Sequence, residues 1–113
     1  MATPAEIRDQ LIKDLRATLE QLSSPEWLSM ISVASKRQKD AAGRKALDAQ
    51  LALLRLENEA LTSFRDQLVA NEAAIADSTK RLRAAVDRLQ SVAKVLSALT
   101  GLLKLVGRVV ALV

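Results

Sequence analysis

The chain contains no cysteine and no histidine, and it has few aromatic, glycine or proline residues. The two missing types exclude disulfide bonds, thiolate nucleophiles and zinc sites built from sulfur and imidazole ligands. Trp27 and Phe64 are the only aromatic residues, and three glycines and two prolines occur in 113 residues. Sheet proteins are richer in aromatic and turn residues, so this composition indicates a protein built from long helices.

The sequence also lacks the arrangements of residues that enzymes need. It has no glycine-rich phosphate loop, and its serines and threonines have no histidine to activate them. The acidic residues between positions 57 and 77 are spread along the chain, and di-iron bundles require histidine partners beside such carboxylates. We therefore expect no enzymatic activity, no catalytic residue, no cofactor and no bound metal ion.

The most informative pattern is a large aliphatic residue at every seventh position of the second half of the chain. Its members are Leu47, Leu54, Leu61, Leu68, Ile75, Leu82, Leu89, Leu96, Leu103 and Val110. Apolar residues at heptad spacing mark the buried seam of long packed helices. The positions three residues later are mostly polar up to Ser78 and apolar from Val92 onward, so hydrophobicity rises toward the C-terminus.

These patterns predict an all-α fold in a single helical domain, residues 1–113. We expect a short N-terminal amphipathic helix in residues 1–24, a long helix with a heptad seam in 25–78 and a basic amphipathic helix in 79–113. The helices should lie near 4–22, 25–70 and 79–112. The last two are expected to form an antiparallel coiled-coil hairpin, and the alternative is one continuous rod from about residue 44. Leu47, Leu51 and Leu54 are expected to face inward.

The C-terminal third combines the strongest apolar character with most of the positive charge. Residues 80–113 carry seven basic and one acidic side chain, a net charge of +6. Lys94, Lys104 and Arg108 gather on one narrow side of a helix, and charges so placed argue against a simple membrane span. A basic amphipathic helix of this kind lies on a membrane surface, inserts as part of an oligomer or docks into an apolar groove.

We expect the chain to form a homo-oligomer, because the hairpin would leave one side of the C-terminal helix uncovered. In that hairpin the apolar residues 104–113 would face the polar residues 36–45, which cannot bury them. The oligomerisation seam is expected to comprise Leu82, Val86, Leu89, Val92, Leu96, Leu99, Leu103 and Val106. The residues expected to contact lipid are Lys94, Lys104, Arg108, Leu105, Val109, Val110 and Leu112.

Two functional classes follow from this reading. The leading hypothesis is a non-enzymatic, self-assembling protein whose C-terminal helix contacts or enters an anionic membrane, with pore formation by a ring as one form of that activity. The alternative is a soluble coiled-coil adaptor or structural protein that binds partner helices.

Nucleic-acid binding through the basic residues 36–45 and 80–88 is the least favoured function, because no aromatic residue interleaves with these charges. Glu6, Arg8 and Asp9 would interrupt the apolar core of a secretory leader. We therefore expect a cytoplasmic or membrane-associated protein, with leaderless export left open.

Overall fold

The structure is a computed structural model that describes residues 3–88 and 91–110, and these residues form helices and no strand. The helices are α1 (Pro4–Gln21), α2 (Pro25–Ser32), α3 (Lys36–Asn58), α4 (Leu61–Ala70), α5 (Glu72–Arg88) and α6 (Val92–Val109). The prediction of an all-α fold is confirmed.

Side-chain caps explain where most of these helices begin. Thr3 and Glu6 form a reciprocal capping box at α1, in which each residue's backbone N–H donates to the other's side-chain oxygen. Ser24, Ser35 and Ser91 each accept a hydrogen bond from the backbone N–H three residues later, at the starts of α2, α3 and α6. α4 begins after Ala60, which provides no side-chain cap. The local sequence therefore specifies most helix starts, and α4 depends on its packing.

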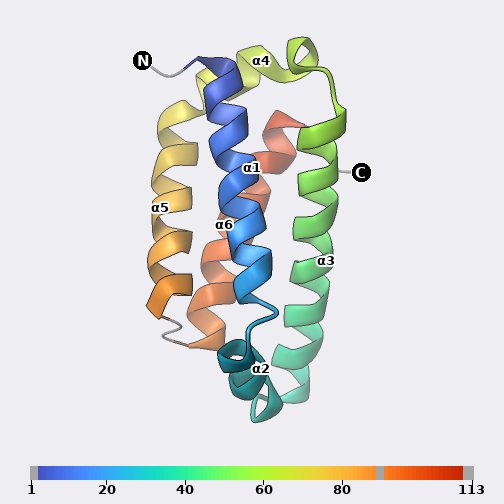
Figure 1. Ribbon diagram of the computed structural model, residues 1–113, viewed down its shortest axis with the longest axis vertical. Helices are drawn as coiled ribbons and strands as arrows, with labels where there is room; N and C mark the ends of the chain where they lie inside the picture. The colour runs from blue at the N-terminus through green and yellow to red at the C-terminus, as the bar shows by residue number, and fades with distance from the viewer. Residues whose placement is uncertain (1–2, 89–90, 111–113) are drawn as a thin grey trace.

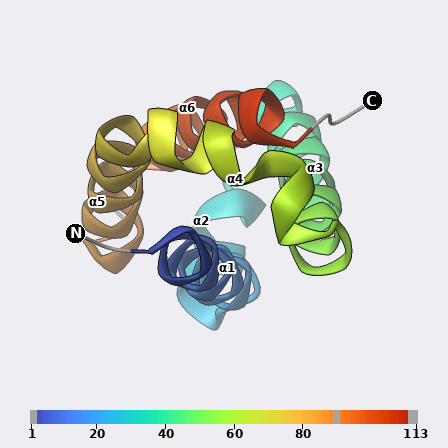
Figure 2. The same cartoon turned by 90° about the horizontal axis from the view of Figure 1, so that it is seen from above.

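Four helices, α1, α3, α5 and α6, lie side by side in a bundle, while α2 and α4 cover its opposite ends (Figure 1). α1 and α6 each contact both α3 and α5 and occupy opposite corners of the bundle (Figure 2). α1 and α5 run in one direction, and α3 and α6 run in the other. α4 carries the chain across the end of the bundle from α3 to α5, which lie at the other two corners.

The prediction of two long helices near 25–70 and 79–112 is wrong, and so is the alternative of a continuous rod. The helical run is interrupted between α3 and α4 at Glu59 and Ala60, and α5 ends at Arg88 while α6 begins at Val92. The longest dimension of the molecule is 44 Å, whereas a helix from residue 44 to the end would extend roughly 100 Å at 1.5 Å per residue. The predicted pairing of residues 36–45 with 104–113 is also wrong, because α3 and α6 run parallel (Figure 1). The antiparallel pair of consecutive long helices is α5 and α6.

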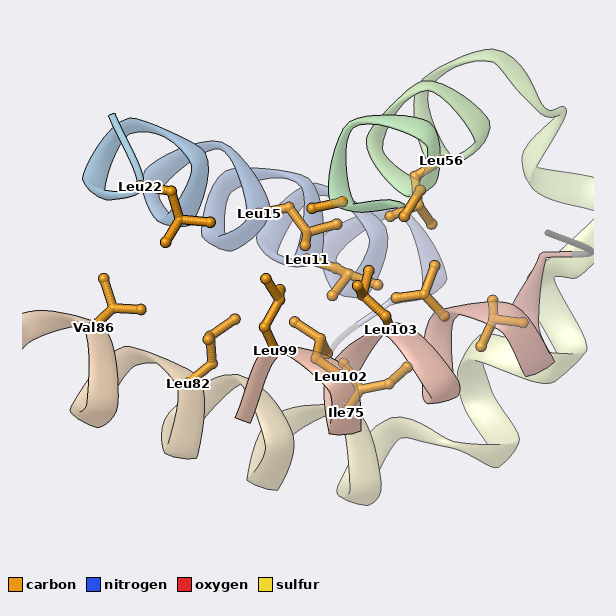
Figure 3. Packing of buried hydrophobic residues seen from close by; sticks show 14 of the residues in the cluster. Leu11, Leu15, Leu22, Leu56, Ile75, Leu82, Val86, Leu99, Leu102 and Leu103 are labelled. Carbon is orange, nitrogen blue, oxygen red and sulfur yellow. The ribbon is translucent and has the colours of Figure 1, made fainter. Parts of the chain in front are cut away.

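The core lies between the four long helices and is centred on α6. Val95, Leu99, Leu102 and Val106 of α6 have no exposed surface. Leucines of α1 point from the opposite side toward α5 and α6 in the same cluster (Figure 3). α6, which has more buried residues than any other described helix, is therefore covered by the chain itself.

Candidate functional site

α3 turns its leucines outward and its alanines inward. Leu47, Leu51 and Leu54 are 56%, 51% and 53% exposed, although the heptad pattern predicted that they face inward. The buried side of α3 instead consists of Ala42, Ala49, Ala52 and Leu56. We call the three exposed leucines the α3 ridge. At 100° per residue they lie within a narrow stripe, so they form one continuous surface feature.

Close packing explains the inward alanines. α3 lies against both α1 and α6, and small side chains allow helix axes to approach closely at such contacts. Leu53 and Ala46 face α1 partly buried, and Arg16 of α1 donates to Glu57 of α3 at 2.6 Å. Since the buried side is already occupied, the α3 ridge points away from the bundle. Contiguous exposed apolar residues of this kind mark interaction sites more often than isolated ones do.

A groove between α3 and α6 borders the ridge. Its lining combines an apolar floor with a mainly basic rim and consists of Lys45, Asp48, Leu51, Arg55, Thr100, Leu103 and Lys104. Leu51 belongs to both the ridge and the groove, so the two form one surface. Arg55 Nη1 donates to Glu59 Oε1 at 3.0 Å within the same helix, and both side chains are exposed. Such a surface can hold an amphipathic helix by apolar contact, with charges at the edges setting its orientation.

The residues expected to form an oligomerisation seam lie inside this single chain. Leu82, Val86, Val92, Leu99, Leu103 and Val106 are buried and Leu96 is partly buried, while Leu89 lies outside the described residues. The premise that one chain cannot cover this side of the C-terminal helix is wrong, because α3, α4 and α5 all pack against α6. In the closed bundle, the described seam residues other than Leu96 are therefore buried within one chain.

The residues expected to contact lipid divide into two groups. Lys94, Lys104 and Arg108 are exposed on the outer side of α6. Leu105, Val109 and Val110 are buried, and Leu112 lies outside the described residues. Among residues 3–88 and 91–110, no helix has the length and apolar character needed to cross a bilayer. The closed bundle thus exposes the cations of α6 and covers its apolar side chains.

A salt bridge joins α1 and α5, between the partly buried Asp14 and the exposed Arg83. Arg83 Nη2 donates to Asp14 Oδ1 at 2.7 Å, and Gln10 Nε2 donates to the same oxygen at 3.1 Å. The hydrogen bond and charge of Asp14 raise the pKa of the Arg83 guanidinium above its usual range, so Arg83 stays charged. In the described part of the chain no cluster of acidic residues is arranged to hold a metal ion. We interpret the Asp14–Arg83 pair as structural.

No protein-family model, characterised protein or solved structure matches the chain. Function is therefore inferred from the surfaces of α3 and α6. The α3 ridge was missed because leucine outweighs alanine in any hydrophobicity pattern. A second heptad series in the sequence would have identified the buried side. It consists of Ala42, Ala49 and Leu56, and Ala52 lies three residues after Ala49.

Proposed function

We propose that the chain is a non-enzymatic helix-binding protein, which docks an amphipathic partner helix along the α3 ridge and the adjoining groove. The observation that carries the proposal is the orientation of α3, which exposes three leucines while burying alanines on the same helix. Full burial of a leucine side chain contributes about 1.5–3 kcal/mol. Because each ridge leucine is about half exposed, covering all three provides an apolar contribution of about 3 kcal/mol before the cost of association.

This proposal retains the adaptor class and assigns partner binding to the part of the heptad series that lies on α3. The seam residues contribute to the fold, so they are unavailable to a partner in the closed bundle. The ridge is available without any rearrangement, and the charges on its border, both basic and acidic, set the orientation of a bound helix.

A peptide titration followed by NMR tests the proposal. The probe is a designed amphipathic peptide with leucines at heptad a and d positions and glutamates on its flanks. We expect amide shifts confined to residues 47–55 and 100–104, and little change with a scrambled peptide of the same composition. Leu51→Asp should abolish binding. Val69→Asp is the matched control, since Val69 is 53% exposed on α4, and it should leave binding intact. Shifts scattered over the surface, or no shifts at all, would contradict the proposal.

Membrane contact is the second candidate function, and the composition of α6 is the observation that favours it. Three exposed cations lie on the helix that also carries the most apolar face of the chain. Near an anionic surface each of these charges contributes about 1 kcal/mol. Insertion of the apolar face would additionally require the bundle to open, because α3, α4 and α5 cover that face.

Vesicle flotation tests membrane contact without disturbing the core. The triple variant Lys94→Glu, Lys104→Glu and Arg108→Glu reverses only exposed charges, and it should abolish flotation with anionic vesicles if α6 binds them. The control reverses Lys36, Arg37 and Lys39, which are exposed on α3. Equal flotation of both triple variants would refute the role of α6. Truncation before α6 is unsuitable, because it removes the centre of the core.

A further inference from the structure

The pattern of side chains on α3 identifies a partner for the ridge, an inference that rests on the proposed function. We propose that the helix docked on the α3 ridge is α3 of a second copy, and that the two helices pair antiparallel about a two-fold axis near Leu51. The ridge is suited to this pairing because its leucines occupy consecutive a and d positions of a heptad. Leu51 stands at a, and Leu47 and Leu54 stand at the d positions on either side of it. In an antiparallel pair, Leu51 of each copy packs against Leu47 or Leu54 of the other. The same surface patch on both copies is the condition for a two-fold interface.

The charges beside the ridge favour the antiparallel arrangement over the parallel one. Asp48 and Arg55 are seven residues apart and lie on the groove side of the ridge, where both line the groove. Antiparallel pairing brings the Asp48 of each copy to the Arg55 of the other, so the two-fold axis generates two ion pairs. In the single chain Arg55 forms an ion pair with Glu59. That pair is exposed, so Arg55 can leave Glu59 for Asp48 of the other copy at little cost in free energy.

Parallel pairing would place Asp48 and Arg55 opposite the other flank of the ridge. That flank presents Gly43 and Gln50 at the corresponding positions, and neither carries a charge. In the antiparallel pair, no like charges meet on this flank, because Gln50 lies opposite Gln50 and the charged Glu57 lies opposite Gly43. Charge complementarity therefore selects the antiparallel, two-fold dimer.

The small size of the ridge indicates a weak dimer. A stable interface buries about 800 Å² on each partner, and three half-exposed leucines with two ion pairs provide less than that. We expect association at protein concentrations on the order of 100 µM and monomers at low micromolar concentration.

Sedimentation over a concentration series, with paired charge reversals, tests the proposal. The wild-type chain should dimerise as concentration rises. Asp48→Arg should weaken association at least tenfold, because it places two arginines together, and Arg55→Asp should do the same with two acids. The double variant carrying both changes should restore the dimer, since the exchanged charges again face each other. Leu51→Asp should remain monomeric, and Val69→Asp should behave as wild type. Circular dichroism melts of each variant verify folding.

Spin labels on single cysteines determine the direction of pairing. Labels at Gln50 should lie close together across the axis, whereas labels at Asn58 should be offset by roughly 20 Å along the helices at 1.5 Å per residue. Equal short distances at both positions would indicate a parallel pair and overturn the proposal. Failure of the double variant to restore association would also overturn it. If the wild-type chain stays monomeric while the designed peptide still binds the ridge, the second copy is excluded and the helix-binding function stands. If neither associates, both proposals fail.

Discussion

Replacing Leu99 by alanine tests whether α6 belongs to the core of the single chain. Leu99 lies in the middle of α6, has no exposed surface and packs within the cluster that joins the long helices (Figure 3). Truncation of a buried leucine to alanine costs about 2.7–5 kcal/mol, because transfer energy is lost and a cavity remains. The lower end of this range, about 3 kcal/mol, is the smallest cost that we expect.

The expected change in melting temperature follows from the size of the chain. An unfolding entropy of about 2.1 cal/mol/K per residue gives the 113-residue chain roughly 0.24 kcal/mol/K. A loss of about 3 kcal/mol therefore lowers Tm by roughly 12 °C. The measurement is thermal and urea denaturation at low micromolar concentration, followed by circular dichroism.

Leu54→Ala is the matched control, because it makes the same chemical change on a leucine that is 53% exposed. Leucine and alanine are both good helix formers, so the control should change the free energy of unfolding by less than about 0.5 kcal/mol. Equal effects at the two positions would refute the assignment of α6 to the core. A dependence of the Leu99→Ala effect on protein concentration would do so as well, because the helix would then be buried between copies.

Three further predictions concern helix ends and exposed glycines. Gly43→Ala and Gly101→Ala should each stabilise the chain by up to about 1 kcal/mol, visible as a higher urea midpoint, because both sites are helical and a Cβ would meet nothing within 4 Å. Ser91→Ala should cost about 1 kcal/mol in the same assay, because it removes the cap of α6. Glu6 accepts a backbone hydrogen bond that lowers its pKa below 4.5, so its contribution to stability is present above that pH and is lost as pH falls through the lowered value. Glu6→Gln should therefore reduce the fall of Tm below pH 4.5.

The sequence predicted helix starts well where a side chain caps the helix. The predicted helix starts near residues 4 and 25 are confirmed, and Thr3 and Ser24 cap the helices there. The end of α3 was missed because no glycine, proline or capping side chain marks it. The break at Ala60 instead allows Phe64 and Leu68 of α4 to cover the end of the bundle, which is a tertiary effect. A local pattern carries no information about such a contact.

The heptad series was interpreted as one seam, and the structure shows why that interpretation failed. Leu68, Ile75, Leu82 and Val110 are buried although they lie on three different helices, α4, α5 and α6, or at their ends. Each helix needs one apolar stripe, and all these stripes face the same core. The seven-residue spacing of apolar residues therefore continues from one helix to the next. Among the described members of the series, only Leu47 and Leu54 on α3 point outward. There, alanine and leucine stripes both fit the helical period, and the distance to neighbouring helices decides which one is buried.

Thiol accessibility along α3 tests the orientation of this helix most directly. The chain has no cysteine, so single cysteines at positions 47, 49, 51, 52, 54 and 56 can be introduced without any other change. At low micromolar concentration, we expect a thiol reagent to label positions 47, 51 and 54 at rates near that of the unfolded chain. Labelling at 49, 52 and 56 should be slower by at least a hundredfold, because those sites are fully buried. Fast labelling at 49, 52 and 56 with protection at 47, 51 and 54 would contradict the existence of the α3 ridge.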